Sequence, residues 1–132
     1  AFLQTASAAL PLNQLHVISA DWARTSALRE MQNLSVEEVT EVEAVICSND
    51  SMALGVADFY AQQNLPPPVI IGINGIQDMQ DAIDAGVIYG TVDLNVPEQA
   101  KTIFAIIQGN FDAGAEMPKE KVCYLPQSPY TK

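Results

Sequence analysis

The stretch that decides the fold is EAVICSNDSMALGVADF, residues 43–59. After Glu43 comes a short apolar run rich in valine and isoleucine, which is typical of a strand covered on both faces. The polar pair Asn49–Asp50 follows, and a helical pattern of apolar residues occupies 51–63. Both Asn and Asp favour helix starts, because their side-chain oxygens accept bonds from free N–H groups of the first turn. The stretch therefore predicts a strand, a polar turn and a helix.

The same unit recurs along the chain. Further predicted strands lie at 15–19, 68–73, 89–93 and 121–125. Further predicted helices lie at 24–34, 77–85 and 97–108, and the capping box SVEE at 35–38 predicts a short extra helix or turn. This alternation predicts an α/β fold, with a parallel sheet sandwiched by helices and right-handed crossovers. With 132 residues, of which 48% are hydrophobic, the chain has enough apolar surface for one core.

Composition excludes several classes of partner. The net charge is −10 and only six residues are Lys or Arg, so the surface repels nucleic acid and anionic membranes. The apolar run VIIGI is far below the ~20 residues that cross a bilayer. Cys47 and Cys123 each lie in a strand-like pattern, which favours two buried free thiols over a disulfide.

No catalytic set assembles along the sequence. There is one histidine, and no serine or cysteine stands in a nucleophile motif. The stretch IGINGI, 71–76, matches neither of the glycine-rich phosphate-binding patterns. A paired-carboxylate hydrolase and a metal site at Asp50 and Asp93 stay disfavoured alternatives, because the spacing fits neither. We therefore expect no enzyme activity, no cofactor and no metal.

Polar side chains follow each of the first four predicted strands. They are Asp21, Trp22 and Arg24, then Asn49 and Asp50, then Asn74, then Asp93 and Asn95. Ligands of open parallel sheets bind beyond the carboxyl ends of the strands. Amides, an arginine and an aromatic ring are the groups that bind the hydroxyls and the C–H face of a sugar. The alternatives are structural: Asn and Asp cap helices, Trp22 covers the sheet edge, and Arg24 pairs with Asp21.

Three segments carry a resemblance to a known family. ADWARTSALREMQNL (20–34), EAVICSNDSMALGVADF (43–59) and VIIGINGIQDMQDAIDAGVIYGTVDLNVPEQAKTI (69–103) resemble the C-terminal half of type I periplasmic sugar-binding proteins, in particular the ribose-binding branch. Members are two-lobed clamps that close over a sugar and deliver it to an ABC importer or a receptor. Effector cores of the lactose-repressor type share the ND-x-MALG stretch, so a transcription regulator or a membrane sensor is the alternative.

The resemblance implies a role for most of these residues. Trp22 takes the position of an aromatic ring that stacks on the sugar, and Asn49 that of an amide that binds a hydroxyl. Asn74 stands where the family usually has Asp in a GFDG-like turn, which makes ribose itself a doubtful ligand, and Asn95 stands where ribose binders have Gln. Asp50 is then expected to be the structural cap of the helix at 51–63. Arg24 is kept as a ligand-binding candidate for its residue type.

The resemblance also implies a domain organisation. Residues 1–95 correspond to the C-terminal lobe without its first strand, and 96–132 to the hinge-crossing helix and a terminal strand. That helix, 97–108, carries an apolar stripe and is expected to pack on a missing N-terminal lobe or on another copy of the chain. The expected partners are a small carbohydrate and an ABC permease or receptor. The expected location is periplasmic or extracellular, with a lipid anchor in a Gram-positive source.

Overall fold

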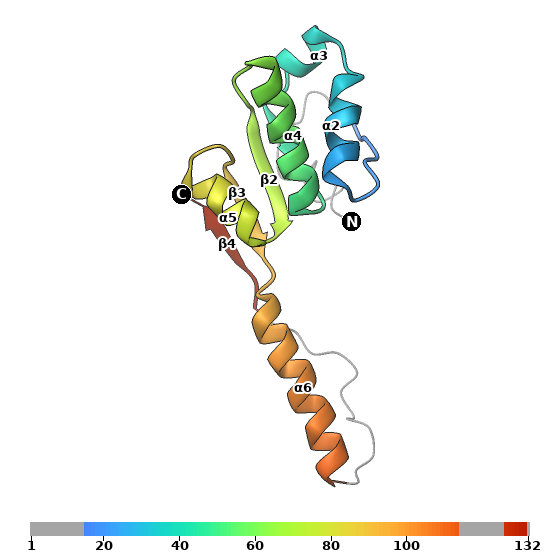
Figure 1. The fold of residues 1–132 in the computed structure, drawn as a ribbon, viewed down its shortest axis with the longest axis vertical. Coiled ribbons are helices and arrows are strands. Elements are labelled where there is room, and N and C mark those ends of the chain that lie inside the picture. Colours follow the sequence, from blue (N-terminus) through green and yellow to red (C-terminus); the bar gives the residue numbers. More distant parts are fainter. Residues whose placement is uncertain (1–14, 114–125, 132) are drawn as a thin grey trace.

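The computed structural model describes residues 15–113 and 126–131. In chain order its elements are α2 (Arg24–Gln32), α3 (Val36–Thr40), β1 (Ala44–Ile46), α4 (Asp50–Gln63), β2 (Val69–Asn74), α5 (Gln77–Asp84), β3 (Gly90–Asp93), α6 (Val96–Ala113) and β4 (Ser128–Thr131) (Figure 1). The predicted alternation is confirmed from α2 to α6. The capping box at Ser35 is also confirmed, since its side chain and that of Glu38 each bond the other's backbone N–H.

The sheet has four strands in the order β1-β2-β3-β4. β1 pairs with β2, and β2 with β3, in parallel, whereas β4 runs antiparallel to β3. The fold is therefore α/β with a mainly parallel sheet flanked by helices, as predicted. β4 was not predicted, and the strand predicted at 121–125 lies outside the described residues.

The strand predicted at 15–19 is wrong in this structure. Those residues carry no strand pairing, and β1 forms the edge of the described sheet. Leu15, Val17 and Ile18 are all exposed. An apolar run indicates a tendency to be buried, but a strand also needs a neighbour that supplies its hydrogen bonds. No signal in the run itself identifies that neighbour.

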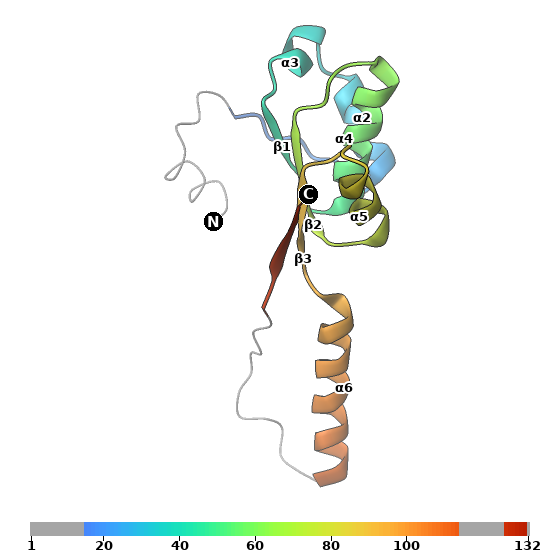
Figure 2. The same cartoon turned by 90° about the vertical axis from the view of Figure 1, so that its left-hand side faces the viewer.

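The core lies between the sheet and one layer of helices. Figure 2 shows α2, α4 and α5 on the same side of the strands. Tyr60 of α4, Ile70 of β2 and Met79 of α5 are almost completely buried there. The Tyr60 hydroxyl donates to the Val39 carbonyl oxygen at 2.8 Å, so the one polar atom of this side chain is satisfied inside the core. This packing fixes the positions of the helices and thus of the turns that precede them.

Cys47 lies at the end of β1, is buried and is a free thiol. Burial, and to a smaller extent the nearby Asp50 carboxylate, raises the pKa of Cys47 to about 11. Because the thiolate is the reactive form, this thiol is unreactive near neutral pH. The free state predicted for Cys47 is confirmed, whereas Cys123 lies outside the described residues.

Helix α6 projects away from the rest of the described structure (Figures 1 and 2). It continues to Ala113, beyond the end expected at Gly109. Glycine inside a helix costs about 1 kcal/mol relative to alanine, which weakens a helix without ending it. Ile103, Phe104 and Ile107 are exposed on α6. None of the helices in the described part of the chain is long and apolar enough to cross a membrane.

Candidate functional site

Four sequence-predicted site residues come together at the carboxyl edge of the sheet. Asn49 follows β1, Asn74 ends β2 and Asn95 follows β3. These strands are parallel, so their carboxyl ends share one edge. Trp22 lies in the turn before α2, and its carbonyl oxygen accepts a hydrogen bond from Asn49 Nδ2 at 3.0 Å. Three amide residues therefore lie at one edge, and the backbone of Trp22 is bonded to it.

The backbone at this edge is conformationally unusual. Among the described residues, five non-glycine positions have positive φ: Asp21 (47°), Trp22 (60°), Asn64 (53°), Asn74 (136°) and Asn95 (51°). Asn64 is the left-handed cap at the end of α4, and the other four all lie at the carboxyl edge. Such conformations cost roughly 1–3 kcal/mol each and persist only where the surroundings enforce them. Four of the five positive-φ residues are thus concentrated at this edge.

Asn49 is the N-cap of α4. Its backbone is extended, with φ −150° and ψ 165°, and its Oδ1 accepts from the Met52 N–H at 2.8 Å. The expectation that Asp50 provides this cap is wrong, because the helix begins one residue earlier than predicted and Asp50 already lies inside it. A single side chain thus both caps α4 and holds the Trp22 carbonyl.

Replacing Asn49 with alanine is expected to lower the free energy of unfolding by roughly 0.5–2 kcal/mol, because the cap is lost. Asn49→Ser is the matched control, since its hydroxyl oxygen keeps a helix cap and it has no Nδ2 donor for Trp22. Urea denaturation followed by circular dichroism measures both. A serine variant as unstable as the alanine variant would show that the cap is not the dominant contribution.

Asp50 is completely buried. Its Oδ2 accepts from the backbone N–H groups of Gly75 and Ile76 at 2.7 and 2.9 Å, and its Oδ1 accepts from Thr91 Oγ1 at 2.6 Å. The carboxylate therefore joins α4 to the turn after β2 and to β3. Sequence reasoning missed this role, because no local pattern places Thr91 beside Asp50.

Arg24 is not brought to this edge. Its Nε and one terminal nitrogen donate to the two carboxylate oxygens of Asp58 at 2.6 and 2.8 Å, and this bonding raises the Arg24 pKa. Asp58 lies more than two turns along α4 from the helix start, given ~3.6 residues per turn. The guanidinium thus points along α4 and pairs with Asp58 rather than with Asp21. We leave Arg24 out of the proposed ligand-binding set.

The remaining side chains are available to a ligand. Trp22 is 67% exposed, Asn95 is exposed and Asn74 is half-buried. Within the described residues, the side chains of Asn74 and Asn95 make no hydrogen bond. The three described Lys and Arg residues are each paired with a carboxylate: Arg24 with Asp58, Arg29 with Glu30 and Lys101 with Glu98. The described edge therefore offers amides and an aromatic face, and no unpaired cation.

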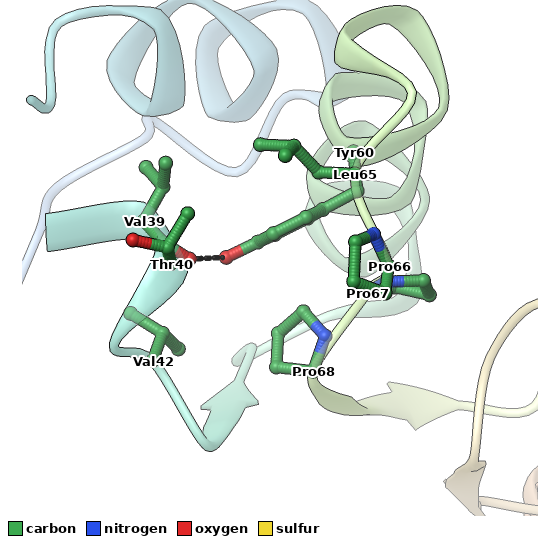
Figure 3. A pocket seen from close by; sticks show the side chains of 8 residues that line it. All are labelled: Val39, Thr40, Val42, Tyr60, Leu65, Pro66, Pro67 and Pro68. Carbon is green, nitrogen blue, oxygen red and sulfur yellow. Dashed lines mark hydrogen bonds between the residues drawn. The ribbon is translucent and has the colours of Figure 1, made fainter. Parts of the chain in front are cut away.

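The described residues form neither a metal site nor a second polar pocket. No group of three or more side chains suited to a metal gathers in the described part of the chain. A hollow of about 250 Å³ lies at the amino ends of β1 and β2 (Figure 3). Asn49, Asn74 and Asn95 lie at the carboxyl ends of the strands, on the opposite edge of the sheet. It is lined by Val39, Thr40, Val42, Tyr60, Leu65, Pro66, Pro67 and Pro68. The hydroxyls of Thr40 and Tyr60 already donate to backbone carbonyls, so this hollow offers little for a polar ligand.

Comparison with known proteins identifies similar chains. The D-allose-binding periplasmic protein of Escherichia coli K12 is 29% identical over 103 residues, covering 77% of this chain and 33% of that protein. The ribose import binding protein RbsB of Salmonella typhimurium is 33% identical over 96 residues, covering 73% and 32%. This chain thus spans about a third of the length of these relatives.

Solved structures and a family model agree with this similarity. A Caulobacter myo-inositol binding protein matches with a TM-score of 0.74 and 25% identity, over 85% of this chain and 38% of that one. A galactofuranose binding protein matches with a TM-score of 0.83 and 21% identity, over 98% and 45%. The model of the periplasmic binding protein domain matches residues 2–114. With this match over most of its length, the chain belongs to the periplasmic binding protein family.

Proposed function

We propose that this chain is a sugar-binding lobe of a solute-binding protein that serves an ABC importer. The observation that carries the proposal is the gathering of Trp22, Asn49, Asn74 and Asn95 at one sheet edge, with three of the four at positive φ. The names of the relatives, which bind allose and ribose, favour transport over the regulator or sensor alternatives. The proposed location is the periplasm, and the proposed macromolecular partner is the importer's permease.

The proposed ligand is a neutral sugar or polyol. Trp22 stacks on its C–H face, and the three amides exchange hydrogen bonds with its hydroxyls. Asn49 already uses one oxygen lone pair and one N–H, so it contributes a single donor and a single acceptor. A carboxylated ligand is disfavoured, because every described Lys and Arg is already paired and an unpaired buried charge is costly.

A second lobe completes the proposed clamp. One sheet edge cannot enclose a ligand, whereas known small-molecule sites bury most of the ligand surface. Contact of both lobes with the sugar only in the closed state supplies the differential affinity that shifts the population to that state. We propose that α6 leads to this second lobe. The terminal strand predicted to pack there is different in position, because β4 pairs with β3 in the sheet of the first lobe. The protein binds its sugar and does not convert it.

The test of this function uses the 132-residue chain. Nuclear magnetic resonance titration with D-ribose, D-allose and myo-inositol is expected to shift the side-chain amide signals of Asn74 and Asn95, with weak affinity because half of the site is missing. D-gluconate is the anionic control and is expected to cause no shift. The sugar signals stay unchanged with time, since no reaction occurs. Absence of shifts with all three neutral compounds would contradict a sugar site built on these residues.

The exposed stripe of α6 is expected to cause association of the isolated chain. Ile103, Phe104 and Ile107 present a contiguous apolar surface, and such surfaces mark interfaces. Phe104→Glu is expected to shift the chain to monomer in analytical ultracentrifugation. Gln108→Glu is the matched control, because it adds the same charge to the same helix at a polar position. A wild-type chain that sediments as a monomer at all concentrations contradicts the prediction.

A further inference from the structure

Asp50 lies directly behind the proposed ligand-binding edge and reaches no ligand itself. It is completely buried, and both of its carboxylate oxygens accept hydrogen bonds. Oδ2 accepts from the turn that follows β2, and Oδ1 accepts from Thr91 of β3. We infer that Asp50 is the positioning residue of the site: it fixes the turn Asn74–Gly75–Ile76 and thereby the direction of the Asn74 side chain. The predicted effect on sugar affinity rests on the proposed function, whereas the predicted effect on the conformation of the turn does not.

The turn has a backbone that residues rarely adopt unaided. Asn74 has φ 136° and Gly75 has φ 77°. The N–H groups of Gly75 and Ile76 converge on the single oxygen Oδ2 of Asp50. The relative direction of two consecutive N–H groups is set by the residue between their peptide planes, here Gly75 in its left-handed conformation. The bond to the Gly75 N–H also holds the peptide plane that follows Asn74, so Asn74 lies between this plane and its pairing with β3. The carboxylate therefore stabilises this turn conformation. Without it, the connection between β2 and α5 is expected to adopt another conformation.

Three further hydrogen bonds hold the Asp50 carboxylate and the turn after β2 in place. Thr91 Oγ1 donates to Asp50 Oδ1 at 2.6 Å and sets the rotation of the carboxylate. Gln80 Nε2 donates to the Gly75 carbonyl at 2.9 Å, and the Leu94 N–H donates to the Asn74 carbonyl at 3.2 Å. None of these three bonds involves the N–H groups of Gly75 and Ile76, which in the described structure donate to Asp50.

The charge of Asp50 is balanced by dipoles alone. It forms no ion pair in the described part of the chain, and its partners are two backbone N–H groups and one hydroxyl. As the first residue of α4 it also lies at the positive end of that helix. Hydrogen bonds to an ionised acceptor are about twice as strong as neutral ones. An amide at this position keeps the shape and holds the turn more weakly, whereas a methyl group does not hold it.

The experiment compares Asp50→Asn, Asp50→Ala and the control Tyr60→Phe in the 132-residue chain by nuclear magnetic resonance. The alanine variant is expected to change the Asn74 coupling constant that reports φ and to speed hydrogen exchange of the Gly75 and Ile76 amides. The asparagine variant is expected to keep the coupling constant and to speed the exchange of both amides about tenfold, because a neutral acceptor is weaker. Tyr60→Phe removes a buried hydrogen bond of similar length, the one to the Val39 carbonyl, which contacts neither Asp50 nor the turn, and it is expected to leave both signals unchanged.

Titration with D-allose adds the functional readout. The alanine variant is expected to bind at least about tenfold more weakly than the wild type, and Tyr60→Phe to bind within about twofold of it. If Asp50→Ala does not fold, the exchange rates in Asp50→Asn decide the inference. Unchanged Gly75 and Ile76 signals in the asparagine variant, or an equal loss of sugar affinity in Tyr60→Phe, would overturn it. A wild-type chain that binds no sugar refutes the proposed function, while the coupling constants and exchange rates still decide the role of Asp50.

Discussion

Replacing Gly72 with alanine is expected to lower the free energy of unfolding by about 3 kcal/mol or more. Gly72 is buried in the middle of β2, and a Cβ there would collide with Asp50 Oδ1 and lie 2.9 Å from the Met79 methyl carbon. The methionine is flexible and can move. The carboxylate cannot, because three short hydrogen bonds hold it. The alanine therefore either strains β2 or breaks the bonds that fix the turn after it.

Gly109→Ala is the matched control for this substitution. A Cβ at Gly109 meets no atom within 4 Å, and alanine is favoured over glycine inside a helix by up to about 1 kcal/mol. Urea denaturation followed by circular dichroism is expected to show a large loss for Gly72→Ala and none for Gly109→Ala. Equal stability of the two variants would mean that Asp50 can move away at little cost. That result would also weaken the positioning role proposed for it.

Replacing Trp22 with glycine is expected to abolish most ligand binding without loss of stability. The side chain is 67% exposed, so its removal takes little from the core. Its backbone has φ 60°, a left-handed conformation that costs a non-glycine residue about 1–2 kcal/mol. Glycine adopts it freely, although its unfolded state is more flexible by roughly 0.5–1 kcal/mol. Loss of the stacking ring is expected to weaken sugar binding by about 2 kcal/mol, or roughly thirtyfold.

Trp22→Ala separates the two effects. It removes the same ring but keeps a Cβ in the left-handed conformation, so it is expected to lose binding equally and to gain no stability. Affinities are measured by the amide shifts of Asn74 and Asn95 with D-allose, and stabilities by urea denaturation. Trp22 is the one tryptophan of the chain, and its fluorescence is expected to change on ligand binding in the wild type. Full affinity in both variants would remove Trp22 from the site.

Much of the fold follows from patterns that are local in the sequence. The strand at β2 is predicted by a run of valine and isoleucine, and the capping box at Ser35 is predicted by its spacing alone. These features depend on residues a few positions apart, which periodicity and capping rules describe. The strand predicted at 15–19 and the missed strand β4 differ in kind. Their pairing partners lie far away in the sequence or are not identified by it, and short runs carry no information about distant neighbours.

The candidate site divides in the same way. The sequence by itself determined that Asn49, Asn74 and Asn95 stand at strand ends, and a parallel sheet brings such ends together. Trp22 has no strand before it in the described structure, and its carbonyl is held at the same edge by Asn49. Only the tertiary structure decided what neighbouring polar residues do. Asn49 caps α4 and holds Trp22, Asp50 turns inward to the next strand's turn, and Arg24 pairs with Asp58. The physical reason is that residue type sets which bonds a side chain can make, whereas burial and distant partners select which of them form.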